Sequence, residues 1–180
     1  AELQQLLQSL ARKREAEKVS TATPSRNKSG LAASGSAAID AGVSGAGSRD
    51  FGGSRGSMPM PASGKILKRF GQKRPESGLA WDGILLGVPE GQPVSAVFRG
   101  QVVFSDWFGS FGQLLVLDHG DGYMSLYGHN QLLHVSIGSM VDSGQKIASA
   151  GSTGGLLRPA LYFEIRHNGY PDDPLKWCKL

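Results

Sequence analysis

The first part of the chain shows the apolar spacing of a helix. Leu3, Leu6, Leu7 and Leu10 recur three and four positions apart between Gln, Arg and Glu residues. This stripe is typical of an amphipathic helix or of a coiled coil. One helix of this length is not stable alone in water, so its apolar side needs a partner. Residues 1–19 therefore fit equally well the end of a coiled-coil helix or a helix that packs on its own domain.

The composition changes between residues 20 and 64. Residues 29–64 contain nine Gly and eight Ser, too little apolar area to offset the backbone entropy lost on folding. The pattern predicts a flexible linker over 20–64. Within it, Leu31, Ile39 and Val43 stand among alanines and have enough apolar area for a short helix that docks on another surface. A plain linker remains the alternative.

From residue 65 onward the pattern predicts short strands. VSAVFRGQVVFSDW, GQLLVLDHG, YMSLYGHN and IASAGS are rich in Val, Leu, Phe and Tyr, and Gly, Asp and Asn separate them. The sequence HGDG at 119–122 predicts a hairpin, because Asp-Gly supplies the positive φ of a type I′ turn. The fold class is mainly β. Residues 65–180 are predicted to form one compact antiparallel β domain, a sandwich or an open barrel.

Charge and cysteine content narrow the function classes. The formal net charge is +4, but residues 1–76 hold thirteen Lys/Arg against six Asp/Glu, whereas residues 77–180 hold six against nine. The predicted β domain is thus mildly acidic, which argues against a nucleic-acid partner. Its single Cys178 excludes an internal disulfide and a multi-cysteine zinc site. No stretch approaches the length of an apolar membrane helix.

The histidines alone do not define a catalytic site. His119, His129, His134 and His167 form no His-x-His pair, although a zinc hydrolase needs about three ligands and a general base. No GxSxG motif is present, and a Ser-His-Asp triad assembled across space stays open. A lone histidine such as His129 is more often a packed or hydrogen-bonding residue than a catalyst.

The order of the β segments is more specific. WDGILLGVPEGQPVSAVFRGQVV, LLVLDHGDGYMSLYGHN, GSMVDSGQKIASAG and RPALYFEIRHNGY follow one another as in the LytM, or lysostaphin-type, zinc endopeptidase domain. The resemblance covers Lys65 to Leu180.

The resemblance also shows which catalytic positions differ. Active members bind zinc through a His and an Asp four residues apart, and these positions carry Trp81 and Leu85 here. Their late His-x-His, which supplies the third ligand and a catalytic histidine, falls on Ala160 and Tyr162. A further catalytic histidine is retained as His129. We therefore expect no metal, no cofactor and no catalytic residue.

This pattern of substitutions, behind a coiled-coil-like helix and a linker, resembles the degenerate LytM proteins of the EnvC type. The resemblance implies a non-catalytic, periplasmic activator of peptidoglycan N-acetylmuramoyl-L-alanine amidases in cell division and daughter-cell separation. It also implies contact with an FtsE-FtsX-type transporter through a missing upstream coiled coil. Peptidoglycan stays open as a further partner.

The lost zinc site would then be an apolar groove that binds the amidase. Alternation in LYFEIR places Tyr162 and Arg166 on one face of a strand and Phe163 on the other, and Arg166 is expected to pair with a carboxylate of the partner. A segment near residues 30–50 is expected to cover the groove and inhibit the protein. The expected lining comprises Trp81, Leu85, Phe111, Leu114, Tyr127, His129, Tyr162 and Arg166.

Three other functions compete with this hypothesis. One is a zinc peptidoglycan endopeptidase with substitute ligands around His129. Another is a module that binds peptidoglycan directly. A lipoyl- or biotinyl-type carrier would need a modifiable lysine at an exposed hairpin tip, and Lys146 lies instead in a turn that leads into a strand.

Overall fold

The computed structural model describes residues 2–21, 50–75 and 77–179 and separates them into two units. Helix α1, Glu2–Thr21, belongs to the first unit, and the second unit begins at Asp50. A helix was predicted over residues 1–19, and α1 matches that prediction closely. The segment near 30–50, including Leu31, Ile39 and Val43, lies outside the described residues. Among those that are described, no helix has the length and apolar character needed to cross a membrane.

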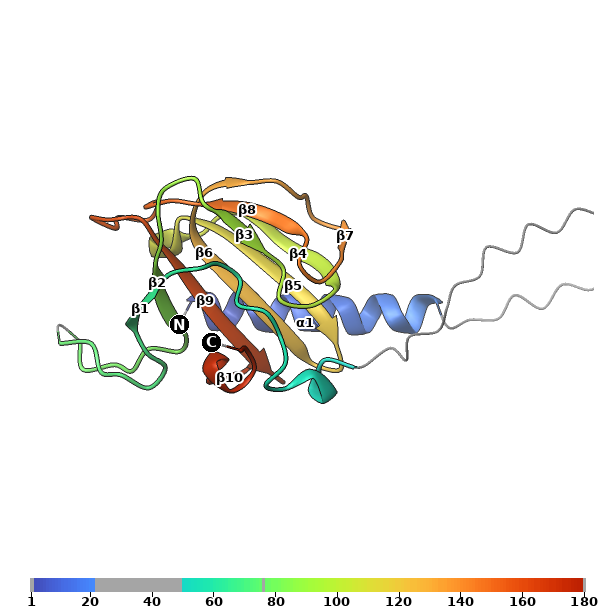
Figure 1. The fold of residues 1–180 in the computed structure, drawn as a ribbon. Helices are drawn as coiled ribbons and strands as arrows, with labels where there is room; N and C mark the ends of the chain where they lie inside the picture. The colour runs from blue at the N-terminus through green and yellow to red at the C-terminus, as the bar shows by residue number, and fades with distance from the viewer. Residues whose placement is uncertain (1, 22–49, 76, 180) are drawn as a thin grey trace, which may run out of the picture. The chain divides into compact units, whose positions relative to one another are not determined.

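The second unit is built on a ten-stranded sheet, in which all strand pairs are antiparallel (Figure 1). The main order is β1-β2-β9-β6-β5-β4-β7, while β10 pairs with β9 and β8 joins β3 to β6. The predicted mainly β, antiparallel fold is confirmed. The strands are β1 Lys65–Lys68, β2 Ile84–Gly87, β3 Pro93–Ser95, β4 Gly100–Trp107, β5 Gln113–Gly120, β6 Tyr123–Leu133, β7 Met140–Val141, β8 Lys146–Ala150, β9 Ala160–His167 and β10 Tyr170–Asp172, with 3₁₀ turns at Gly52–Ser54, Gly109–Phe111 and Pro174–Lys176.

The hairpin between β5 and β6 forms as the sequence predicts. Asp121 and Gly122 connect the two strands, with φ angles of 51° and 79°. Two successive residues at positive φ define the type I′ turn, whose twist matches that of the flanking strands. This turn fixes the register that pairs Val116 with Leu126.

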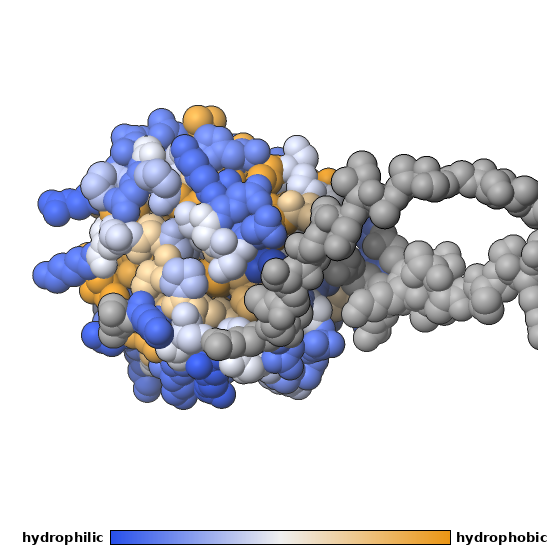
Figure 2. Space-filling view, turned by 45° about the vertical axis from the view of Figure 1, so that its right-hand side comes forward, coloured by the Kyte–Doolittle hydropathy of each residue, from blue (hydrophilic) through white to orange (hydrophobic). Residues whose placement is uncertain are grey.

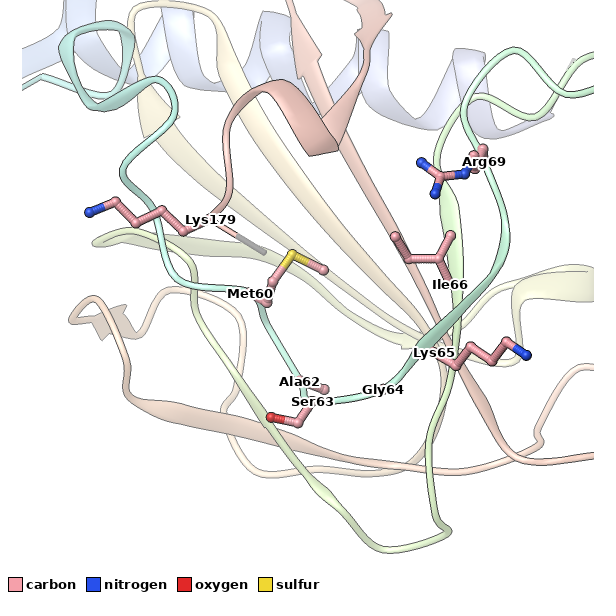
Figure 3. Close-up of a pocket in the computed structure, with 8 residues that line it drawn as sticks. All are labelled: Met60, Ala62, Ser63, Gly64, Lys65, Ile66, Arg69 and Lys179. Carbon is pink, nitrogen blue, oxygen red and sulfur yellow. The ribbon is translucent and has the colours of Figure 1, made fainter.

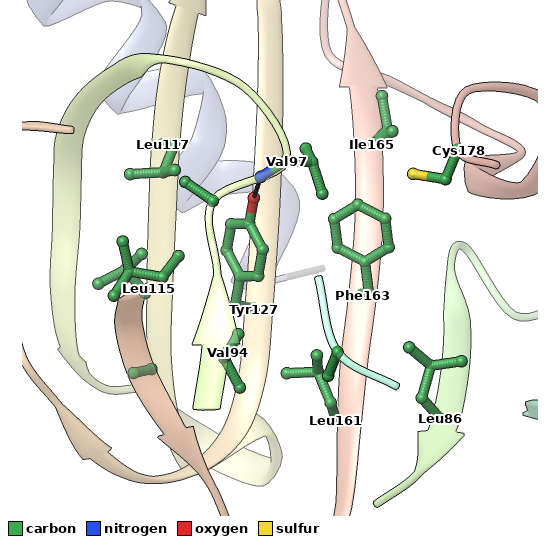
Figure 4. Packing of buried hydrophobic residues seen from close by; sticks show 14 of the residues in the cluster. Leu86, Val94, Val97, Leu115, Leu117, Tyr127, Leu161, Phe163, Ile165 and Cys178 are labelled. Atoms are coloured by element: carbon green, nitrogen blue, oxygen red, sulfur yellow. Dashed lines mark hydrogen bonds between the residues drawn. The ribbon is translucent and has the colours of Figure 1, made fainter. Parts of the chain in front are cut away.

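Alternation along the central strand β9 divides the sheet into two faces. Leu161, Phe163 and Ile165 are fully buried in the main core, and Tyr162 belongs to a separate cluster on the other face. Figure 4 shows Phe163 packed beside Tyr127 of β6 within this core, where their ring centroids lie 5.4 Å apart. The division predicted from LYFEIR is therefore confirmed.

The folded unit starts earlier in the chain than residue 65, so the linker predicted over 20–64 is wrong for its last part. Phe51, Met58 and Ala62 are buried in the main core. The Phe51 ring stacks on His119 at 4.6 Å and on Tyr123 at 4.8 Å between centroids. The glycines and serines around these apolar side chains form the turns that bring them to the core.

Hydrophilic side chains cover most of the face drawn in Figure 2, and an apolar area lies near its middle. Exposed large apolar side chains also occur singly, such as Leu157 and Tyr170. Scattered apolar residues of this kind are normal on a protein surface.

The position of Phe51 gives a first prediction. A chain that begins at Lys65 should be much less stable than one that begins at Asp50, because it lacks the apolar side chains that residues 51–62 supply to the core. Phe51→Ala alone should lower the free energy of unfolding by about 3 to 5 kcal/mol.

Urea unfolding followed by circular dichroism measures both effects. Leu157→Ala is the matched control, since this side chain is fully exposed, and it should change stability by less than about 0.5 kcal/mol. Equal stability of the two truncated chains would contradict the packing of residues 50–64.

Candidate functional site

The positions that the family resemblance matches to zinc ligands and a catalytic histidine come together in one apolar cluster. Leu85 of β2 pairs directly with Tyr162 of β9, and both are buried with Ala160. These three side chains, and the half-buried ones packed against them, lie on the face of the sheet opposite the main core. We call this group the site cluster; it comprises Leu85, Ala160 and Tyr162, with Trp81, Phe111 and Leu156 packed against them.

The site cluster is packed and not open. Tyr162 is only 1% exposed, and the Trp81 and Phe111 rings lie 6.3 and 5.0 Å from its ring. The surface that the cluster presents therefore consists of Trp81, Phe111 and Leu156, which are half-buried. The expected apolar character is present, but Leu85 and Tyr162 lie beneath the residues that a partner would meet.

His129 adjoins the site cluster in an unusual backbone conformation. Its φ is 64°, a region that few residues other than glycine adopt. Its Nδ1 lies 2.8 Å from the Thr153 carbonyl oxygen, and its ring stacks on Phe111 at 6.3 Å. Burial lowers the pKa of His129, partly offset by the bond to Thr153. The ring is thus held as a neutral, packed group.

A polar network lies beside the aromatic rings on β9. The Tyr162 hydroxyl donates to Glu164 Oε2 at 2.7 Å, and Arg166 Nε donates to Glu164 Oε1. Arg166 also donates from Nη1 to the Gly169 carbonyl at 3.1 Å, and its Nη2 lies 3.7 Å from Asp82 Oδ2. Glu164 is fully buried, so its carboxylate depends on these donors for its stability.

Burial has a large effect on Glu164. It raises the pKa of this carboxyl group from 4.5 to about 7, although the charge of Arg166 and the hydroxyl of Tyr162 oppose the rise. Burial and the neighbouring Glu164 also raise the pKa of Tyr162 far above its usual range. The phenol is therefore a fixed donor.

The structure changes the expected role of Arg166. Its side chain is 3% exposed and already contacts Glu164, Asp82 and Gly169. A partner carboxylate would have to displace these contacts. Arg166 is better described as a residue that holds the Glu164 carboxylate in place.

Tyr127 does not lie with the site cluster, so its predicted place in the groove is wrong. Its ring belongs to the main core, and its hydroxyl accepts hydrogen bonds from Val97 N at 3.1 Å and from the Ser125 hydroxyl at 2.9 Å. The cause is its register opposite Phe163, which points to the core. Leu114 shares the sheet face of Tyr162 but is fully buried and outside the site cluster.

The side chains present at the matched positions do not fit a zinc ion. Zinc needs nitrogen, sulfur or carboxylate ligands. The matched positions carry instead an indole at Trp81, alkyl groups at Leu85 and Ala160, and a phenol at Tyr162 that is hydrogen-bonded to Glu164. His129 is the one matched residue with a ligating group. Across residues 2–21, 50–75 and 77–179, no group of three His, Cys, Asp or Glu side chains is placed to hold a metal ion.

A cavity of about 630 Å³ lies beside β1, and none of the matched positions lines it. In Figure 3, Met60 and Ile66 face each other across it, and Lys65, Arg69 and Lys179 lie around its margin. Its lining holds three cationic residues and no acidic one. None of these residues corresponds to a catalytic position of the zinc endopeptidases.

Comparison with known proteins agrees with the fold. The family model "Peptidase family M23" matches residues 80–174. A murein hydrolase activator EnvC of Escherichia coli is 44% identical over 127 residues, which are 71% of this chain and 30% of that protein. A murein hydrolase activator NlpD of the same organism is 36% identical over 118 residues, 65% of this chain and 30% of that protein.

Solved structures show the same architecture. A zinc-containing peptidase from Vibrio cholerae has a TM-score of 0.62 and 31% identity, over 66% of this chain and 39% of that one. The catalytic domain of lysostaphin from Staphylococcus simulans has a TM-score of 0.58 and 28% identity, over 62% and 90%.

The fold and the position of the site define a β domain of the LytM type, and the chain belongs to peptidase family M23. Within that family its relatives include the murein hydrolase activators EnvC and NlpD. The chain spans about 30% of the length of these relatives.

The alternation in LYFEIR places Glu164 on the groove face, but the expected lining did not include it, and it did not include Asp82 or Arg74. Glu164 stood on the correct face of LYFEIR, between Tyr162 and Arg166, and this i, i+2 spacing was the available signal. Nothing in the sequence indicated that Arg74, in the loop before β2, lies over Trp81.

The raised pKa of Glu164 predicts a dependence of stability on pH. Between pH 4.5 and 7 the folded protein retains a proton that the unfolded chain releases, so this group's contribution to stability is lost as the pH rises. Glu164→Gln lacks the titrating group. The wild-type free energy of unfolding should fall relative to this variant by on the order of 2 kcal/mol between pH 4.5 and 7.

Urea unfolding of both proteins at several pH values tests this difference. His119, whose pKa burial lowers from 6.5 to about 4, acts in the opposite direction over the same range. It is present in both proteins and cancels in the comparison. A pH-independent difference between the two proteins would show that folding does not raise the pKa of Glu164.

Proposed function

We propose that this chain is a non-catalytic activator of peptidoglycan N-acetylmuramoyl-L-alanine amidases in cell division and daughter-cell separation. The observation that carries the proposal is that Trp81, Leu85 and Tyr162 stand at the matched zinc-ligand positions and Ala160 at that of a catalytic histidine, packed as an apolar cluster. Such a cluster has no means to activate water, but its outer aromatic rings suit contact with a protein segment.

The relatives support the same function. EnvC and NlpD of Escherichia coli are named murein hydrolase activators, and DipM of Caulobacter vibrioides is named a cell division protein. We accordingly propose that the chain acts in the periplasm and that its partner there is an amidase. An FtsE-FtsX-type transporter would contact the protein through an upstream coiled coil.

The alternative of a zinc endopeptidase has less support. Substitute ligands around His129 would need further His, Asp, Glu or Cys side chains close by, and the described residues supply no such group. His129 Nδ1 is already bonded to the Thr153 carbonyl.

The proposal predicts that peptidoglycan is released only when both proteins are present. The chain alone and the amidase alone should release little dye-labelled peptidoglycan, and the mixture should release much more. Trp81→Ala or Phe111→Ala should weaken amidase binding by about 1 to 4 kcal/mol, because these rings form the outer surface of the site cluster.

Two control variants separate binding from folding. Tyr170→Ala removes an exposed aromatic ring from β10 and should leave activation unchanged. Phe163→Ala removes a core ring and should lower the melting temperature. Release of peptidoglycan by the chain alone would favour a hydrolase and contradict the proposal.

We also propose that a segment near residues 30–50 inhibits the activator. Its apolar residues Leu31, Ile39 and Val43 are tethered to the domain, and tethering can raise the effective concentration to the millimolar range. The high Gly and Ser content weakens any helix there, so the inhibition is expected to be partial.

A chain of residues 50–180 should therefore activate the amidase more strongly than the full chain at equal concentration. Residue 50 is the correct start, since Phe51 and Met58 belong to the core. Activation is measured across a titration of each protein. Identical curves would remove the inhibition while leaving the activator function in place.

A further inference from the structure

Arg74 lies at the edge of the site cluster. Its guanidinium carbon is 4.1 Å from the centre of the Trp81 ring, and that ring packs against Tyr162. This is the geometry of a cation–π contact, in which the ring fixes the plane of the guanidinium group.

The backbone around Arg74 is fixed by hydrogen bonds. Arg74 N donates to the Leu79 carbonyl at 2.8 Å, and the Arg74 carbonyl accepts from Gly78 N at 2.8 Å. Trp81 N donates to the Gln72 carbonyl at 2.9 Å, so the two sides of the loop are tied together. These backbone hydrogen bonds therefore hold Arg74 and Trp81 next to each other.

Among the described residues, the Arg74 side chain is held by its stacking on Trp81. Within the part of the chain that the structure describes, it forms no hydrogen bond or ion pair, and its Nε is buried without a partner. Buried donors without an acceptor are rare in proteins and costly. Arg166 differs, because Glu164, Asp82 and Gly169 all contact it.

The charges around the site cluster are unevenly matched. The carboxylates of Asp82 and Glu164 both lie against Arg166. Arg74 thus brings a positive charge to the apolar surface formed by Trp81, Phe111 and Leu156 without a described acidic partner. A complementary segment would carry apolar side chains and one carboxylate beside them.

We infer that Arg74 is the charged residue through which this domain recognises the amidase, and that the bound amidase segment places an Asp or Glu carboxylate on it. The inference rests on the proposed function and assigns to Arg74 the role that the sequence suggested for Arg166. A carboxylate can accept two parallel hydrogen bonds from the guanidinium group, which gives direction as well as affinity.

Binding of the full chain to each N-acetylmuramoyl-L-alanine amidase of the source organism tests the inference, at low and at moderate salt. Arg74→Gln should weaken binding on the order of tenfold at low salt and reduce its salt dependence. Arg74→Lys keeps the charge but loses the planar fork, so its affinity should fall between those of Arg74→Gln and the wild type.

Lys73→Gln is the matched control, because it removes the same charge from the neighbouring, exposed position. It should change binding by less than about twofold. Circular dichroism melts should be alike for all three variants. If Arg74→Gln binds as Lys73→Gln does, while Trp81→Ala still weakens binding, the inference is wrong and the proposed function stands. If the wild-type chain binds no amidase, the proposed function itself fails.

Discussion

The alternation of side chains along β9 is the constraint on which the rest of this domain depends. β9 pairs with both β2 and β6, so any shift of its register by one residue would exchange the core and the site cluster. Phe163 and Ile165 anchor one face in the main core. This leaves Tyr162, Glu164 and Arg166 together on the other face, whatever chemistry they carry.

Glu164 shows how that second face tolerates a buried charge. Burial, the Tyr162 hydroxyl and the Arg166 guanidinium group together determine the protonation state of the Glu164 carboxyl group. Burial favours its neutral form and the guanidinium favours its charged form. Breaking such a network by removing one member is costly, because the remaining members stay buried without partners. The network therefore fixes the position of the Tyr162 ring beneath Trp81.

The strands, the turn at Asp121 and the two faces of β9 could be predicted because they follow from local spacing. The packing of Phe51 could not be predicted, because its partners His119 and Tyr123 lie far away in the sequence. The Gly and Ser residues around Phe51 also indicated a linker. Tyr127 was misplaced for a similar reason. Its hydroxyl finds Val97 N across the core, a contact between residues thirty positions apart that no local pattern encodes.

The closed packing of the site cluster has a consequence for recognition. An open apolar groove would expose a large apolar patch, a liability for a free protein. With Trp81 and Phe111 folded over Tyr162, less apolar area is exposed, and less is gained when a partner covers it. Affinity must then depend more on directional contacts at the margin of the cluster. Arg74, stacked on Trp81 and without a described acidic partner, is placed to supply such a contact, and it would favour acidic segments over equally apolar neutral ones.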